Sequence, residues 1–176
     1  MTMITIRELF PAEDQRDLDV LLIAQTEIWN QPEDIKYLSL SQIPLSEDTL
    51  RTWYRSHLED GVHYYCAIEN NGEIAGIAIG KADPVQGYLL LGLGVRQNAR
   101  KRGIGKQLVQ HVIDQAANSG YSAVDVTVFA DNATMLRLLL GLGFIPVRIK
   151  HHLRANGGDL VYMKLYLNSS PGEEPA

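Results

Sequence analysis

The interpretation of the whole chain turns on residues 95–108, which read VRQNARKRGIGKQL. Five of these residues are basic: Arg96, Arg100, Lys101, Arg102 and Lys106. Gly103 and Gly105 interrupt the basic run. The complete chain of 176 residues has a formal net charge of -5, so this cluster is opposite in sign to its surroundings. Such a cluster predicts a site for a negatively charged group.

The residues on either side of the cluster indicate what kind of anion it would hold. The apolar run 88–95 predicts a strand, and a helix is expected to begin near Gly103. The first N–H groups of a helix have no internal partner and carry the positive end of its dipole. Glycines let the backbone approach a bulky anion closely. The pattern therefore predicts a phosphate or pyrophosphate cradle; a solvated helix start, with the glycines serving a turn, is the competing interpretation.

Two common phosphate-binding patterns do not fit this stretch. In the P-loop pattern G-x-x-x-x-G-K-[ST], Arg100 would occupy the first glycine and Gln107 the hydroxyl position. In the dinucleotide pattern G-x-G-x-x-G, a start at Gly92 places Gln97 at the third glycine, and a start at Gly103 places Leu108 there. A nucleotide-phosphate binder therefore stands only as a third hypothesis.

The hydrophobic periodicity predicts a mixed α/β architecture, with one layer of sheet and helices on its faces. The expected elements are a strand over 4–8, a helix over 13–30, a helix capped by Ser46, a hairpin over 63–81, a strand over 88–95, a helix from Gly103 to Gly120, a strand over 124–129, a helix capped by Asp131 or Asn132 and ending near Leu140, and strands over 145–152 and 160–167. The continuous apolar run 88–95 predicts a central strand that is covered on both faces. We expect a single domain over residues 1–167 and a disordered tail over 168–176.

Composition excludes several classes of protein. The chain has 16 Lys and Arg against 21 Asp and Glu, which argues against a general nucleic-acid surface. Cys66 is the only cysteine, so neither an internal disulfide nor a cysteine metal cage is expected, and we interpret it as a small core residue. His151 and His152 are adjacent on a predicted strand and point to opposite faces, so no metal is expected there. No apolar run has the length of a membrane span, and we expect a cytoplasmic protein.

Two motifs in order suggest a family. Residues 100–105 match R/Q-x-x-G-x-G/A, and NATMLRLLLGLGF at 132–144 is similar to N-x-x-A-x-x-L-Y-x-K-x-G-F through Asn132, Leu138 and the final Gly-Phe pair. The chain resembles the GNAT superfamily of N-acetyltransferases, and the order of elements agrees from residue 4 to about 167. The resemblance implies a mostly antiparallel twisted sheet whose central strands splay apart, with helices on both faces.

What the resemblance implies is direct transfer of an acetyl group from acetyl-CoA to a primary amine. Pantetheine would pair with the backbone of Leu93 and Val95, and the Val95 N–H would hold the oxyanion as it forms. Backbone amides from Arg100 to Lys106 would surround the pyrophosphate. The full set of implied cofactor-binding residues is Leu93, Gly94, Val95, Arg100, Lys101, Arg102, Gly103, Ile104, Gly105, Lys106 and Asn132.

The chain departs from the family pattern at the acid and the base. The tyrosine that frequently acts as the acid aligns with Leu139, and the strand 88–95 contains no carboxylate. Another group or water then donates the proton, the thiolate leaves without a specific acid, or the protein is not an efficient catalyst. Substitute catalytic candidates are His63, Tyr64, Asp83 and Tyr88, each of which is alternatively a surface or packing residue.

The acceptor is not identified by the sequence. Trp29, Tyr37 and Trp53 lie in the region that often builds the acceptor pocket of such proteins, and they are equally interpretable as packing anchors. The expected acceptor is a small-molecule or peptide amine. Family members often form dimers, so a homodimer is one expectation. A non-catalytic acyl-CoA-binding sensor or scaffold is the alternative function, and Leu139 is its main support.

Overall fold

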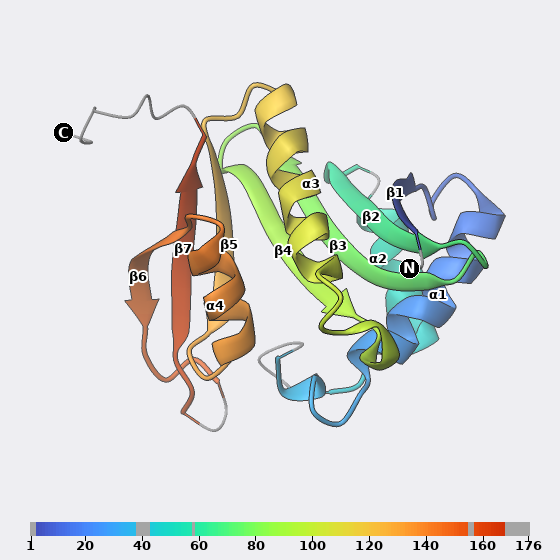
Figure 1. Cartoon of the computed structure of the whole chain (residues 1–176), viewed down its shortest axis with the longest axis horizontal. Coiled ribbons are helices and arrows are strands. Elements are labelled where there is room, and N and C mark those ends of the chain that lie inside the picture. The colour runs from blue at the N-terminus through green and yellow to red at the C-terminus, as the bar shows by residue number, and fades with distance from the viewer. Residues whose placement is uncertain (1–2, 38–42, 58, 155–156, 168–176) are drawn as a thin grey trace.

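The computed structural model describes residues 3–37, 43–57, 59–154 and 157–167 (Figure 1). The tail over 168–176 that we expected to be disordered lies outside these described residues. The elements are β1 (Ile4–Leu9), α1 (Gln15–Trp29), the 3-10 turn η1 (Ile35–Tyr37), α2 (Glu47–His57), β2 (Val62–Glu69), β3 (Ile74–Asp83), β4 (Gly87–Val95), the 3-10 turn η2 (Gln97–Ala99), α3 (Ile104–Asn118), β5 (Ala123–Phe129), α4 (Ala133–Gly141), β6 (Ile145–Lys150) and β7 (Leu160–Tyr166). The predicted order of helices and strands is confirmed.

The strands form one seven-stranded sheet in the order β1-β2-β3-β4-β5-β7-β6. Neighbouring strands are antiparallel except for β4 and β5, which are parallel. The parallel pairing joins only Tyr88–Leu90 to Val124–Val126, and beyond it the two strands separate (Figure 1). The predicted splay of the central strands is therefore confirmed.

Two apolar clusters cover opposite faces of the sheet. Along β2, Tyr64 and Cys66 belong to the cluster with α1 and α2, whereas Tyr65 and Ala67 belong to the cluster with α3 and α4. This assignment follows from the alternation of side chains along a strand. Burial raises the pKa of the Cys66 thiol to about 12, as expected for a small core residue. Among the described residues, no helix is both long and apolar enough to cross a membrane.

Side-chain caps set where the helices begin. The Asp14 carboxylate accepts hydrogen bonds from the N–H groups of Arg16 (2.8 Å) and Asp17 (3.1 Å), so α1 begins two residues later than predicted. The Asn132 side chain accepts from the Met135 N–H (3.1 Å), so Asn132 rather than Asp131 caps α4. Capping matters here because both helices border the cavity described below.

The prediction that β4 is covered on both faces fails at Leu91. Tyr88 and Leu90 are buried, but the Leu91 side chain is 50% exposed. The following residues to Val95 are at most half-buried. Leu91 is the extra residue of a β-bulge, because Gly80 pairs with Leu90 and Ile79 with Gly92, and the departure of β5 leaves the edge of β4 open from Leu91 onward. The apolar run therefore borders a cavity.

Candidate active site

A cavity of about 940 Å³ lies where β4 and β5 separate. Its walls come from the second halves of these two strands, the ends of α1 and α2, and the beginnings of α3 and α4. A cavity of this size is in the range of small-molecule and cofactor sites. The motif around Gly103 and the aromatic residues of α1 and α2 thus line one continuous space.

The glycine-broken turn before α3 lines one part of this cavity. Gly103 is the N-terminal cap of α3 and has a φ of +78°. Residues other than glycine rarely adopt this backbone conformation. The first bond that closes the helix runs from the Gln107 N–H to the Gly103 carbonyl (3.1 Å). The amides of Ile104, Gly105 and Lys106 precede that bond and are available to an anion. All of these residues except Gln107 line the cavity.

The arginines of the basic stretch hold carboxylates of the protein itself. The ion pairs join Arg96 to Glu27 (3.0 Å), Arg100 to Asp34, and Arg102 to Glu69 (2.6 Å). Arg102 does not line the cavity, unlike the other predicted cradle residues. Lys101 and Lys106 do line it, and within the described part of the chain neither forms a salt bridge. These two lysines therefore supply the free positive charge of the cradle.

The open edge of β4 presents two backbone amides to the cavity. The Arg96 N–H donates to the Ala75 carbonyl of the neighbouring β3 segment (2.8 Å). Because N–H directions alternate along a strand, the N–H groups of Leu93 and Val95 point away from β3 and toward the gap left by β5. The Val95 carbonyl also faces away from β3, because it accepts a hydrogen bond from Arg100 Nε (3.1 Å).

Gly94 allows α1 to lie directly on this strand. A Cβ at position 94 would lie 2.5 Å from Ile28 Cγ2 and 3.1 Å from the Trp29 ring. Distances under 3.0 Å are essentially never seen for a real Cβ, so only glycine fits without movement of α1. The implied cofactor strand therefore also fixes the position of Trp29 in the cavity wall.

Aromatic side chains line the same cavity. Trp29, Tyr37 and Trp53 all line it, as expected of acceptor-pocket residues. His57, at the end of α2, lines it as well, and its ring stacks on Trp53 with centroids 6.2 Å apart. Sequence reasoning missed His57 because a single histidine at the end of an amphipathic helix follows no recognisable spacing.

None of the four candidate catalytic residues lines the large cavity. His63 Nδ1 is 2.7 Å from a carboxylate oxygen of Glu8. The Tyr88 hydroxyl is buried and lies 2.9 Å from another tyrosine hydroxyl. Asp83 accepts backbone hydrogen bonds that lower its pKa, and it serves the turn before β4.

Tyr64 differs from the other candidates because its hydroxyl is hydrogen-bonded to Nδ1 of His57. Tyr64 itself is buried and does not line the large cavity, so its connection to the site passes through the histidine. Leu139, at the position of the family's tyrosine, is fully buried, and its neighbour Leu138 lines the cavity instead. No group of three or more potential metal ligands occurs among the described residues.

A mostly antiparallel sheet that opens beside its one parallel strand pair, with a glycine-broken helix start at the opening, is the arrangement that the acetyltransferase fold shares. The chain belongs to the acetyltransferase (GNAT) family, whose sequence model matches residues 24–144. Acetyl-CoA is the cosubstrate that this family assignment supplies. The free lysines and amides of the cradle fit its phosphates.

Two curated proteins are similar in sequence to this chain. The chain is 29% identical over 146 residues to mycothiol acetyltransferase from Jonesia denitrificans, covering 82% of this chain and 45% of that protein. It is 30% identical over 104 residues to N-alpha-acetyltransferase 30 from Saccharomyces cerevisiae, covering 54% of this chain and 58% of that protein. The matches thus span about half the length of these relatives.

Solved structures share the fold. The ribosomal-protein-S18-alanine N-acetyltransferase from Escherichia coli superposes with a TM-score of 0.73 at 21% identity, covering 99% of this chain and 100% of that chain. The phosphinothricin acetyltransferase from Sinorhizobium meliloti, in complex with AcCoA, gives a TM-score of 0.74 at 20% identity, with coverage of 98% and 93%. At sequence identities of 21% and 20%, the similarity to these two structures establishes a shared fold.

Proposed function

We propose that the protein transfers the acetyl group of acetyl-CoA directly to the primary amine of a small-molecule or peptide acceptor. One observation carries this proposal: a single cavity joins the free amides and lysines of the cradle to an aromatic pocket, past the open edge of β4. A thioester bound along that edge would meet an amine held in the pocket. The names of the relatives, among them an N-alpha-acetyltransferase, agree with an amine acceptor.

The residues that would hold the cofactor follow from the geometry. The amides from Ile104 to Lys106, with the side chains of Lys101 and Lys106, would bind the pyrophosphate. The backbone of Leu93 and Val95 would pair with pantetheine. Acetyl-CoA supplies an activated thioester, and the Val95 N–H would stabilise the negative charge that develops on its carbonyl oxygen.

The acceptor end of the cavity favours an amine that carries an apolar group. Asp34 is the one carboxylate among the described residues that line the cavity, and it is paired with Arg100. The cavity walls also include Trp29, Trp53 and Leu45. A polyamine would find no free carboxylate for its additional charges, whereas an aromatic or aliphatic group next to the amine would bury apolar surface.

A panel of acceptors tests the proposed function. We expect release of free CoA from acetyl-CoA with tyramine or a short peptide bearing a free N-terminus, and less release with spermidine. Gly105→Trp should abolish acetyl-CoA binding, because a Cβ at Gly105 already contacts Leu93 and Val95 (3.8 and 3.7 Å) and the indole would fill the pyrophosphate path. Gly141→Trp is the matched control, since a Cβ there meets nothing within 4 Å and Gly141 does not line the cavity. Unchanged acetyl-CoA affinity in folded Gly105→Trp would refute the assigned cradle.

An acyl-CoA-binding sensor is the second candidate. It is favoured by Leu139, which is buried where the family often has its tyrosine acid. Tight binding of acetyl-CoA together with no CoA release on any amine of the panel would establish this alternative. Turnover with one amine at a rate well above acetyl-CoA hydrolysis would exclude it.

A further inference from the structure

His57 occupies a constrained position at the edge of the acceptor pocket. It is the last residue of α2 and is half-buried. Its ring is nearly parallel to that of Trp53 (6.2 Å between centroids, 26°) and to that of Tyr64 (5.9 Å, 26°). Nδ1 is hydrogen-bonded to the Tyr64 hydroxyl. The bond at Nδ1 and the two neighbouring rings fix the orientation of the imidazole, which leaves Nε2 for a second partner.

A second, smaller cavity of about 180 Å³ reaches the same histidine. It is lined by residues of β1, the β1–α1 connection and β2, including Glu8, Glu13 and His63, and also by Tyr64. Among the described residues that line the two cavities, His57 is the one that lines both. The imidazole therefore lies between the large cavity and a smaller, mostly apolar cavity whose lining includes the carboxylates of Glu8 and Glu13.

We propose that His57 is the general base of this site, taking a proton from the acceptor ammonium at Nε2 and later releasing that proton to water. The inference rests on the proposed function, because it requires an amine in the pocket. The Nε2 lone pair accepts one proton from R–NH3+, and the resulting amine attacks the thioester carbon. The C–N bond forms and the C–S bond breaks. The second nitrogen proton ends on the CoA sulfur, so each turnover releases the one proton that His57 removed.

The protonation state of His57 suits this role. Burial lowers its pKa below the ordinary 6.5, Lys81 lowers it further, and Asp60 opposes the shift. The other titratable groups near the ring are Tyr54 and Tyr64, together with Glu8, Glu13 and His63 around the smaller cavity. A lowered pKa means that the imidazole is neutral, and able to accept a proton, at every pH well above 6.5.

Tyr64 acts as a positioning residue. Burial raises the pKa of its phenol, so the hydroxyl stays protonated and uncharged. When its oxygen accepts the Nδ1–H of His57, the neutral tautomer has its lone pair on Nε2, and the same hydrogen bond persists in the imidazolium. Tyr64→Phe removes the bond, and we expect kcat to fall about tenfold while the KM for the acceptor is unchanged.

Substitution of His57 tests the proposal on the full chain, with tyramine as the acceptor. We expect His57→Gln to lower kcat at least about 100-fold while leaving the Kd of acetyl-CoA unchanged. In the native protein, kcat should rise with pH through the pKa of His57, below 6.5, and this limb should be absent from His57→Gln. Added imidazole should restore part of the activity of His57→Ala, which a purely structural role would not produce.

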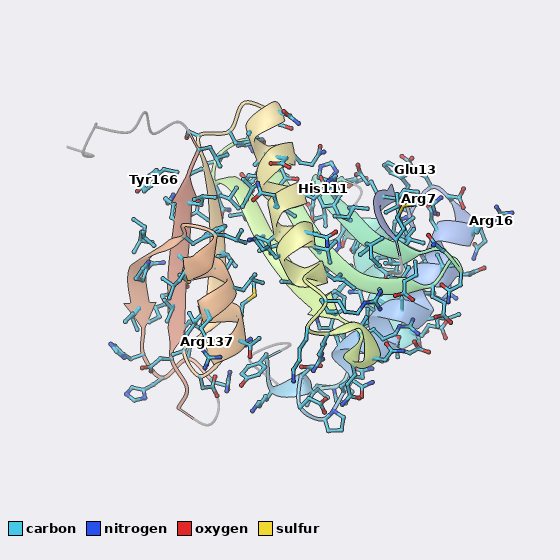
Figure 2. All side chains as sticks on the ribbon, in the orientation of Figure 1. Arg7, Glu13, Arg16, His111, Arg137 and Tyr166 are labelled. Carbon is cyan, nitrogen blue, oxygen red and sulfur yellow. The ribbon has the colours of Figure 1, made fainter. Side chains whose placement is uncertain are left out.

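The matched control is His111→Gln. His111 lies on α3, is half-buried and lines neither cavity (Figure 2). Its substitution should leave kcat and the pH profile unchanged. Native kcat in His57→Gln, or an acidic limb that survives in that variant, would overturn the proposal while leaving acetyl transfer itself established.

A measurement on the protein alone keeps the inference separate from the proposed function. Long-range ¹H–¹⁵N NMR correlations of the labelled chain report the tautomer and the pKa of His57 without any acceptor. We expect a neutral ring protonated at Nδ1, with a pKa below 6.5. Protonation at Nε2, or a pKa above 6.5, would overturn the role of His57 even if the amine panel shows turnover.

Discussion

Each arginine of residues 95–108 reaches a carboxylate from a different part of the chain. Glu27 belongs to α1, Asp34 follows that helix, and Glu69 ends β2. Arg100 also lies 3.7 Å from Glu33. Partly exposed ion pairs of this kind each contribute at most about 1 kcal/mol to stability, but together they fix the turn before α3 against its neighbours. The cradle is thus positioned by arginines and charged by lysines.

The division of roles between lysines and arginines gives a prediction. Lys106→Gln removes a free cation from the cavity wall, so we expect the Kd of acetyl-CoA to rise about tenfold, the value of one charge-assisted hydrogen bond. Arg102→Gln should change that Kd less than about twofold, because Arg102 faces Glu69 and not the cavity. Isothermal titration calorimetry measures both. Equal losses of affinity in the two variants would contradict this division.

Gly94 gives a second prediction at the same scale. Gly94→Ala places a methyl group 2.5 Å from Ile28 Cγ2, so α1 must shift, and we expect a loss of about 1–3 kcal/mol in the free energy of unfolding. Gly92→Ala, two residues earlier on the same face of β4, meets its nearest neighbour at 3.4 Å and should cost less than about 1 kcal/mol. Urea denaturation of both variants compares them directly. A smaller loss for position 94 than for position 92 would contradict the close packing of α1.

At the scale of elements, periodicity and capping residues were sufficient to predict the order of strands and helices. The beginning of α3 followed from its glycines, and the hairpin of β2 and β3 from Asn70-Asn71-Gly72. The exposure of Leu91 could not be predicted, because an apolar run has the same composition whether a neighbour covers it or a cavity borders it. The separation of β4 from β5 was implied by the family resemblance and not by any local pattern, because it depends on pairing between distant residues.

The cap of α4 gives an element-scale prediction. The Asn132 side chain accepts the Met135 N–H, so Asn132→Ala leaves a donor of the first turn unpaired, and we expect a loss of about 1 kcal/mol in the free energy of unfolding. Asn132→Ser, which preserves a capping oxygen, should retain most of the stability. Thermal denaturation distinguishes the two variants. Equal stability of Ala and Ser at this position would show that the cap contributes nothing.

At the scale of the whole molecule, the site is assembled from α1, α2, β4, β5, α3 and α4. The residues of the proposed cradle could be named from sequence motifs, because they are contiguous from Arg100 to Lys106. These motifs did not predict His57, because its relation to the cavity comes from the packing of α2 against Tyr64 of β2. None of the four catalytic candidates proposed from the sequence lines the cavity, since proximity along the chain carries no information about a site built across a sheet.

The short pairing of β4 with β5 leads to a prediction about global stability. A ligand that contacts both sides of the opening binds the folded state alone, and it should stabilise the protein by about 2.7 kcal/mol at a concentration of 100 Kd. We therefore expect the Tm to rise with acetyl-CoA concentration. Gly105→Trp should show no such rise. A ligand-independent Tm in the native protein would contradict binding at the cavity.

The internal ion pairs of Arg96, Arg100 and Arg102 also affect how quickly the cofactor is captured. Charges that are neutralised by adjacent carboxylates produce little potential beyond a Debye length of about 8 Å at physiological ionic strength. An acidic protein in which two lysines without a salt bridge, among the described residues, line the cavity therefore draws a polyanion from solution weakly. The association rate constant should therefore depend only slightly on ionic strength. Selectivity for acetyl-CoA should come mainly from a slow dissociation rate.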